Sequence, residues 1–239
     1  GLDMDQLVCS SFFNDTTGAL SLGKSVHTNA SLQAFTFDCN GIEFLENAAF
    51  IVYSFQFLGD SRMDSTFFGI YADFNIGNPS DDYVGSTLPT SDIVYSYNAD
   101  TLSDAIAGLN PSMLGMNLFN GPLDSNGNEV RLKKVMPIIA DSLFYGTSEP
   151  THFQEFYNYI SGSWRDGRPL TYGGTGFNGI VPTDIAYPDH PADANGWSEL
   201  SSDNPPGDRR VIASYEHISL LPGFGNQIVF SLTASKVSG

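Results

Sequence analysis

The chain has 239 residues, and its 27 acidic side chains outnumber its 10 basic ones to give a net charge of −17. This charge argues against binding to nucleic acid or to anionic membranes, because phosphate groups are neutralised by Lys and Arg. The sequence contains no uninterrupted apolar run long enough to predict a membrane-spanning helix.

The residue composition favours strands and turns over helices. The chain contains 18 Phe and 11 Tyr, and its 24 Gly and 13 Pro are scattered at turn-like spacing. The length is compatible with a single large β-domain over residues 1–239. Within it, residues 1–45 are expected to form an N-terminal arm or a strand pair.

Apolar runs separated by turn residues predict a series of strands. In chain order they cover residues 7–13, 32–37, 48–58, 66–74, 93–97, 113–119, 135–145, 211–214 and 227–234. We therefore expect a mainly β fold, an antiparallel β-sandwich with one short helix and a long ordered loop rich in Gly, Pro and Asp.

The helix is expected in "SEPTHFQEFYNYISG", with Ser148 as its cap, Pro150 in its first turn and Gly162 after its end. Aromatic and aliphatic residues recur there at helical spacing, and we interpret them as core packing. They are Phe153, Phe156, Tyr157 and Ile160.

The long loop covers residues 162–208, where large aromatic residues recur about every ten positions. This recurrence predicts a loop pinned onto a scaffold. Trp164, Tyr172 and Trp197 have two interpretations: they line a platform that binds extracellular glycans, or they anchor the loop.

Cys9 and Cys39 both lie in strand-like sequence. A disulfide between them is expected in an oxidising compartment and would contribute about 3–4 kcal/mol to stability in the chain-entropy model. The alternative is two separate buried thiols.

The stretch "YADFNIGNPSDDYVGS", residues 71–86, concentrates oxygen-bearing side chains with no cationic residue among them. Calcium takes oxygen ligands from carboxylates, amides and carbonyls, so Asp73, Asn75, Asp81 and Asp82 form a candidate calcium site. The spacing does not match an EF-hand. A hydrated turn and an acidic catalytic centre are the alternatives.

Two further acidic segments are weaker metal candidates. Residues 124–129, "DSNGNE", contain Asn-Gly and favour a hairpin turn. Asp189, His190, Asp193 and Asn195 are more typical of a surface loop.

Catalytic motifs have little support, because the sequence contains neither G-x-S-x-G nor H-E-x-x-H. Arg209 and Arg210 begin a predicted strand, where neighbouring side chains face opposite ways. We expect one guanidinium to reach inward to a carboxylate such as Asp208 or Asp166, and the other to face solvent.

The strand predicted near the C-terminus carries neither Pro nor charge over residues 227–235. Such a strand either pairs within its own sheet or meets a neighbouring molecule, because an unprotected edge invites pairing. A repeated head-to-tail contact of the second kind would build a filament.

Several blocks occur in one order: "IYADFNIGNPSDDYVGS", "YSYNAD", "MLGMNLFNGPL", "YNYISGSWRDGRPLTYGGTGFNG", "GWSE" and "PPGDRRVIAS". This order resembles a module of large secreted proteins of Bacteroidetes-type bacteria exported by type IX secretion, over residues 45–235. Asn75 stands where the family commonly has a second Asp. The resemblance implies export, a place at the cell surface and a non-catalytic role.

These observations favour a secreted, non-enzymatic structural or adhesive protein, extracellular or on the cell surface, stabilised by calcium and self-associating into an oligomer or filament. The alternative is a carbohydrate-binding module of a secreted polysaccharide-degrading system.

Overall fold

The computed structural model describes residues 4–14, 26–38, 41–99, 102–103, 108–109 and 112–236. The chain divides into two compact units. The first comprises Gly1–Phe68, Met116–Leu132 and Tyr215–Thr233, and the second comprises Gly69–Gly115, Lys133–Ser214 and Ala234–Gly239. Both units draw on segments far apart in the sequence, so no single cut separates them.

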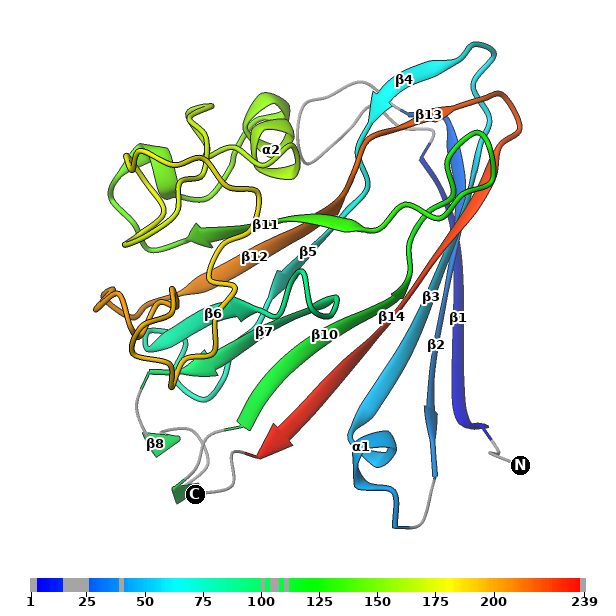
Figure 1. Cartoon of the computed structure of the whole chain (residues 1–239). Helices are drawn as coiled ribbons and strands as arrows, with labels where there is room; N and C mark the ends of the chain where they lie inside the picture. The colour runs from blue at the N-terminus through cyan, green and yellow to red at the C-terminus, as the bar shows by residue number, and fades with distance from the viewer. Residues whose placement is uncertain are drawn as a thin grey trace. The chain divides into compact units, whose positions relative to one another are not determined.

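The fold is mainly β with antiparallel sheets, which confirms the expected class (Figure 1). The strand expected over residues 66–74 is interrupted, because β4 (Met63–Thr66) and β5 (Gly69–Asp73) belong to different sheets. The run expected over residues 135–145 becomes β11 (Leu132–Ile139) followed by the short 3₁₀ helix η1 (Tyr145–Thr147).

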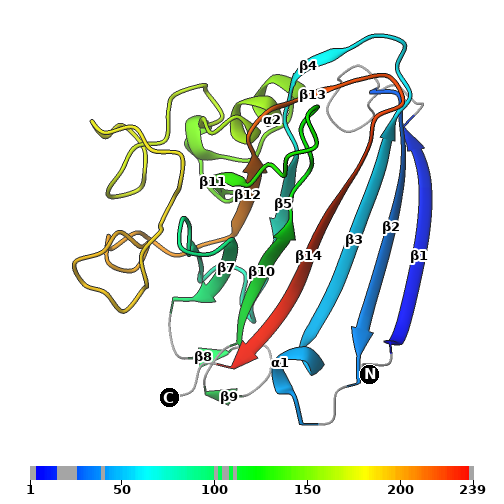
Figure 2. The same cartoon turned by 45° about the vertical axis from the view of Figure 1, so that its right-hand side comes forward.

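The first unit is built on long neighbouring strands. These are β1 (Met4–Asn14), β2 (Thr28–Phe37), β3 (Ala48–Phe57), β14 (Gly225–Lys236) and β10 (Ser112–Asn120), in that order in the sheet. β1 pairs antiparallel with β2, and Figure 2 shows β3, β2 and β1 side by side with β1 outermost. β1 and β2 therefore form a strand pair in this sheet, and the one-turn helix α1 (Glu43–Glu46) precedes β3.

The strand near the C-terminus lies inside the sheet rather than at its edge. β14 pairs antiparallel with β3 from Gly225 opposite Gln56 to Thr233 opposite Ala48, and β10 is its other neighbour. Residues 227–235 were expected either to pair within their own sheet or to meet a neighbouring molecule, and they pair within their own sheet.

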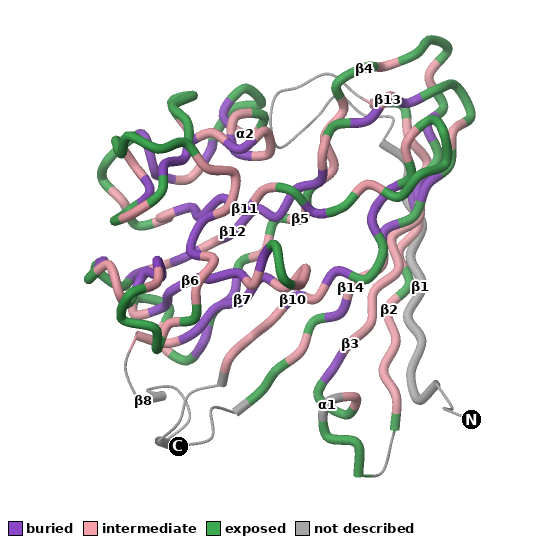
Figure 3. Tube along the Cα trace, viewed as in Figure 1, coloured by how far each residue is buried: buried purple, intermediate pink, exposed green. Residues whose placement is uncertain are grey.

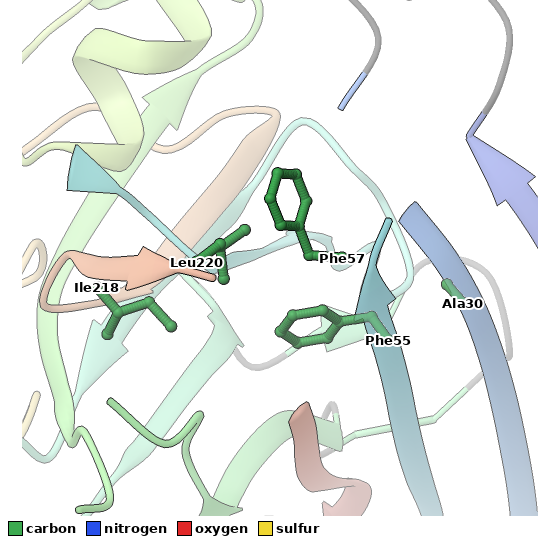
Figure 4. Packing of buried hydrophobic residues seen from close by; sticks show 5 residues of the cluster. All are labelled: Ala30, Phe55, Phe57, Ile218 and Leu220. Carbon is green, nitrogen blue, oxygen red and sulfur yellow. The ribbon is translucent and has the colours of Figure 1, made fainter. Parts of the chain in front are cut away.

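An apolar cluster packs beside these strands in the first unit (Figure 4). Its buried members are Ala30, Phe55, Phe57, Ile218 and Leu220. Ile218 and Leu220 belong to β13 (Ile218–Leu220), which pairs with β4.

The second unit contains the antiparallel pair β6 (Asp82–Ser86) and β7 (Ile93–Asn98), together with a sheet in the order β11-β12-β5. β12 (Arg209–Tyr215) pairs with β5 so that Arg210 lies opposite Asp73. Figure 3 shows β6 and most of β12 buried. A small two-stranded sheet joins β8 (Leu102–Ser103) and β9 (Gly108–Leu109).

The expected helix is present as α2 (Phe153–Ile160), but its start and its buried face differ from the prediction. His152 rather than Ser148 is the N-cap, because the Glu155 carboxylate accepts the Thr151 and His152 N–H groups at 2.7 and 3.3 Å. Burial opposes ionisation of Glu155, yet these bonds and those from Tyr145 and Arg165 hold its pKa at about 2.

The predicted apolar stripe of α2 is only partly in the core. Phe153 and Tyr157 are 55% and 45% exposed, whereas Glu155 and Tyr159 are buried. The periodicity was correct, but the polar partners of Glu155 turn a different side of the helix inward.

The apolar cluster of the first unit offers a matched pair of leucines. Leu220 is 1% exposed and Leu221 is 37% exposed. We expect Leu220→Ala to lower the free energy of unfolding by about 2–5 kcal/mol, because it leaves a cavity. Leu221→Ala should cost under about 1 kcal/mol by urea denaturation. Equal losses in the two variants would contradict this packing.

Candidate functional site

Asp73, in the acid-rich stretch of residues 71–86, forms an ion pair with Arg210 of β12. Arg210 Nε lies 3.2 Å from Asp73 Oδ2 and 3.2 Å from Glu149 Oε2, and Arg210 Nη1 lies 2.8 Å from Asp208 Oδ1. The β5–β12 register produces the first of these pairs directly, because it places Arg210 opposite Asp73. One guanidinium thus balances three carboxylates.

Tyr71 extends this cluster on β5. Its hydroxyl donates to Glu149 Oε1. Partial burial and the nearby Glu149 carboxylate both disfavour the phenolate, so they raise the pKa of Tyr71. The cluster is therefore a set of paired charges with a neutral phenol at its margin.

Among the described residues, no cation lies within hydrogen-bonding distance of Asp82. Its side chain is fully buried, and Oδ2 accepts the Ile76 N–H at 3.2 Å. Oδ1 is buried and has no hydrogen-bond partner among the described residues. Burial raises the pKa of Asp82 to about 7, against the opposing effect of the Ile76 hydrogen bond.

The four predicted calcium ligands meet different partners. Asp73 is paired with Arg210, Asp81 Oδ1 accepts the Asn98 side-chain amide at 3.3 Å, Asp82 is buried, and Asn75 is exposed. In the part of the chain that the structure describes, no group of three or more His, Cys, Asp or Glu side chains is placed to hold a metal ion. Calcium binding by these residues stays a prediction.

Arg209, the other arginine of β12, is paired with Glu199. Its Nε lies 3.1 Å from Glu199 Oε2, and both side chains are almost completely buried. Its Nη2 donates to the Pro205 carbonyl. The prediction that one arginine reaches inward is confirmed for Arg209, but its carboxylate partner is Glu199. The prediction that the other arginine faces solvent is wrong, because Arg210 forms ion pairs.

Asp208 is indeed an arginine partner, but of Arg210, whereas Asp166 lies 3.5 Å from Arg168. Sequence reasoning missed Glu199 as the partner of Arg209. The sequence feature that could have indicated this partner is that Glu199, two residues after Trp197, is the one Glu in a segment otherwise rich in Asp. Glu199 is completely buried, and burial raises its pKa against the opposing attraction of Arg209.

Glu199 also covers the outer edge of β6. Its Oε1 accepts the Val84 N–H at 2.9 Å. On the same strand, the Ser86 N–H donates to the Tyr187 carbonyl at 3.0 Å, and the Gly207 N–H donates to the Asp82 carbonyl at 3.3 Å. Because alternate residues of a strand direct their backbone groups to the same side, residues 82, 84 and 86 present one edge. The long loop satisfies this edge.

A hollow of about 280 Å³ lies beside the Glu199–Arg209 pair, lined by Asp141, Asn204 and Pro206 among others. Arg209 Nη1 and Asp141 Oδ1 are 3.9 Å apart there. This donor and acceptor could hold water or one small hydroxylated molecule. The volume is just below the range of typical small-molecule sites.

The proposed glycan platform consists mainly of buried rings. Trp164 and Trp197 are 0% and 3% exposed, and their indole N–H groups donate to the Gly176 and Gly174 carbonyls at 2.8 and 3.0 Å. Only Tyr172, whose ring centroid is 4.7 Å from that of Trp197, is exposed. These contacts favour the alternative in which the rings anchor the loop.

The two weaker metal candidates form turns. Asp124 Oδ1 accepts the N–H groups of Asn126 and Asn128 at 2.8 and 2.9 Å, in the hairpin turn that the sequence favours.

In the 189–195 segment three of the four candidate side chains cap their own loop. Asp189 accepts the Trp197 N–H, His190 accepts the Ala192 N–H, and Asp193 accepts the Asn195 N–H. One side-chain atom of each of these three residues is thus used locally.

The predicted disulfide involves Cys39, which lies outside the described residues, so it stays a prediction. Cys9 belongs to β1 and lies opposite Gln33, while β2 continues to Phe37.

The buried Asp82 generates a prediction for pH. Its folded pKa of about 7 lies above the value of about 3.9 in an unfolded chain, so the folded state holds this proton more tightly. The contribution of Asp82 to the free energy of unfolding is then highest near pH 4 and falls as the pH rises to 7. Asp82→Asn should flatten this dependence and be more stable than the parent at pH 8, by about 1–3 kcal/mol. Urea denaturation at several pH values measures the free energy of unfolding of both proteins.

The exposed Asp193→Asn is the matched control, because its side-chain oxygen can still accept the Asn195 N–H. Its pH profile should follow that of the parent. Parallel profiles for Asp82→Asn and the parent would contradict the assignment.

The calcium prediction has its own measurement. If Asp73, Asn75, Asp81 and Asp82 bind calcium, adding it should raise the Tm by mass action, and a chelator should reverse the rise. Asp81→Ala should abolish the rise, whereas Asp193→Ala should retain it. An identical Tm with calcium and with chelator would leave the turn interpretation.

None of the described helices is long and apolar enough to cross a membrane. No protein-family model matches the chain, and no curated protein matches it in sequence.

Proposed function

We propose that this protein is a secreted, non-enzymatic structural or adhesive protein of the cell surface that assembles through the free edge of β1. One observation carries the proposal. Among the described residues, the strand order of the first unit ends at β1, and no strand pairs with its outer side. One row of its backbone N–H and C=O groups is therefore available to another strand.

The chemistry of β1 suits strand addition. The strand is eleven residues long, "MDQLVCSSFFN", with Asp5 as its one charged residue and no Pro. Soluble monomers blunt exposed edges with short strands, charges, Pro or bulges. β1 has one irregularity, between Met4 and Gln6, and is regularly paired with β2 from there to Asn14.

A structural role also fits the contacts of the acidic residues. Asp73 balances Arg210, and Glu199 balances Arg209 while covering β6. The resemblance to exported surface modules supports the location outside the cell. Subunits that each carry a charge of −17 repel one another, so added salt or calcium should strengthen assembly.

The assembly is tested by a single residue of β1. Sedimentation velocity over a concentration series should show the parent chain associating, and more strongly with salt. Val8→Lys should weaken association, because it places a charge on the edge. Val8→Thr, which keeps a β-branched side chain without charge, should associate like the parent. A parent chain that stays monomeric at all concentrations, with salt and calcium present, would overturn the proposal.

A further inference from the structure

We infer that the partner of the β1 edge is β1 of a second copy, paired antiparallel about a two-fold axis that passes beside Cys9. The inference rests on the proposed assembly and specifies its partner and symmetry. It replaces the open filament expected from the sequence with a closed dimer.

The outer edge of β6 is unavailable to an incoming strand. The Val84 N–H is bound by Glu199, the Ser86 N–H by the Tyr187 carbonyl, and the Asp82 carbonyl by the Gly207 N–H. A strand added there would have to displace all three contacts and expose the buried Glu199. Head-to-tail addition of β1 to β6 is thus disfavoured by the fold of the second unit itself.

The shorter edge strands offer less backbone to a partner. β5 has five residues and ends at Asp73, and β13 has three. β11 has eight, but the long loop binds its outer side at Val135, whose N–H donates to the Asp184 carbonyl and whose carbonyl accepts the Ala186 N–H. A partner β1 would form fewer than half as many backbone hydrogen bonds on β5 as on another β1. The β1 edge of a second copy offers the longest strand of these edges, with regular pairing geometry from Gln6 onward.

The sequence of β1 is compatible with pairing against itself. Antiparallel pairing centred on Cys9 places this residue opposite its own copy and keeps the irregularity between Met4 and Gln6 at the ends of the paired region. Val8 then lies opposite Ser10, and Asp5 lies opposite Phe13. The two Asp5 residues are about 27 Å apart along the strands, which exceeds the screening length of about 10 Å in 0.1 M salt. No like charges are brought together within the strand pair.

Symmetry then limits the size of the assembly. An isologous contact uses the same surface on both copies and leaves neither copy's β1 free. The dimer is therefore closed, and its first-unit sheets join into one continuous sheet across the two-fold axis.

A pair of double variants tests the register. Val8→Lys with Ser10→Lys places like charges directly opposite each other across the axis and should weaken dimerisation about 10-fold or more. Val8→Lys with Ser10→Glu places opposite charges there and should dimerise within about threefold of the parent. Sedimentation equilibrium measures both, and circular dichroism melting establishes that both are folded. Equal weakening of the two variants would overturn the register.

A cross-linking experiment tests the axis independently of stability. Opposed Cα atoms of an antiparallel pair are about 4.5–5.5 Å apart, within the range that a disulfide spans. In Cys39→Ser, oxidised glutathione should link two copies through Cys9. The two thiols lose two protons and two electrons, and each oxidised glutathione yields two reduced glutathione molecules.

The matched control is Leu7→Cys in a chain that also carries Cys9→Ser and Cys39→Ser. Residue 7 lies opposite residue 11 in this register, so two copies of residue 7 are about 14 Å apart and should not link. Linking of residue 7 as readily as residue 9 would overturn the proposed axis.

The outcomes separate this inference from the proposed function. A dimer that links through Cys9 supports both. A series of larger species without linking at Cys9 overturns the two-fold pairing and retains assembly at the edge. A parent chain that is monomeric under all conditions overturns both.

Discussion

The buried pair of Glu199 and Arg209 is the interaction on which the second unit depends. Taking a carboxylate out of water is costly, and Arg209 Nε and the Val84 N–H together offset that cost. Loss of one partner from such a pair typically costs about 3–5 kcal/mol, because it leaves an uncompensated charge in the interior. Glu199 and Arg209 thereby connect the long loop to β12 and β6, which are far apart in sequence.

The scarcity of basic residues explains how the acidic segments pack. With 10 basic residues for 27 acidic ones, a cation near several carboxylates must serve more than one. Arg210 contacts Asp73, Glu149 and Asp208. Asp82 has no cation within hydrogen-bonding distance among the described residues, and its raised pKa is the consequence of burial. Among the described residues, the carboxylates that suggested a metal site take part in ion pairs and hydrogen bonds, apart from the buried Asp82 with its raised pKa, and calcium binding stays a prediction.

The outer edges of β6 and β1 differ in whether their backbone groups are hydrogen-bonded by other parts of the described chain. The loop that carries Tyr187, Glu199 and Gly207 satisfies the outer groups of β6. β1 has no comparable cover among the described residues. The fold therefore covers one edge with its own chain and, among the described residues, leaves another for pairing, which is the physical basis for proposing assembly through β1.

The sequence by itself determined the local features of this protein. Alternating apolar residues predicted most strands, Asn126-Gly127 predicted its turn, and Gly162 marked the end of the helix, because each of these depends on a few neighbouring residues. Pro150, expected in the first turn, precedes the helix, which begins at Phe153. The strand-like text near both termini was also recognised. The tertiary structure decided which of the two is at an edge: β14 is central and β1 is outermost, since strand order depends on contacts between residues far apart in sequence. Likewise, the partners of Asp73 and Arg209 lie 137 and 10 residues away and follow from register and loop path. The acidic stretch at residues 71–86 indicates that its carboxylates need cations or raised pKa values. The sequence does not show which residues supply the cations, because the partners come together only in the folded chain.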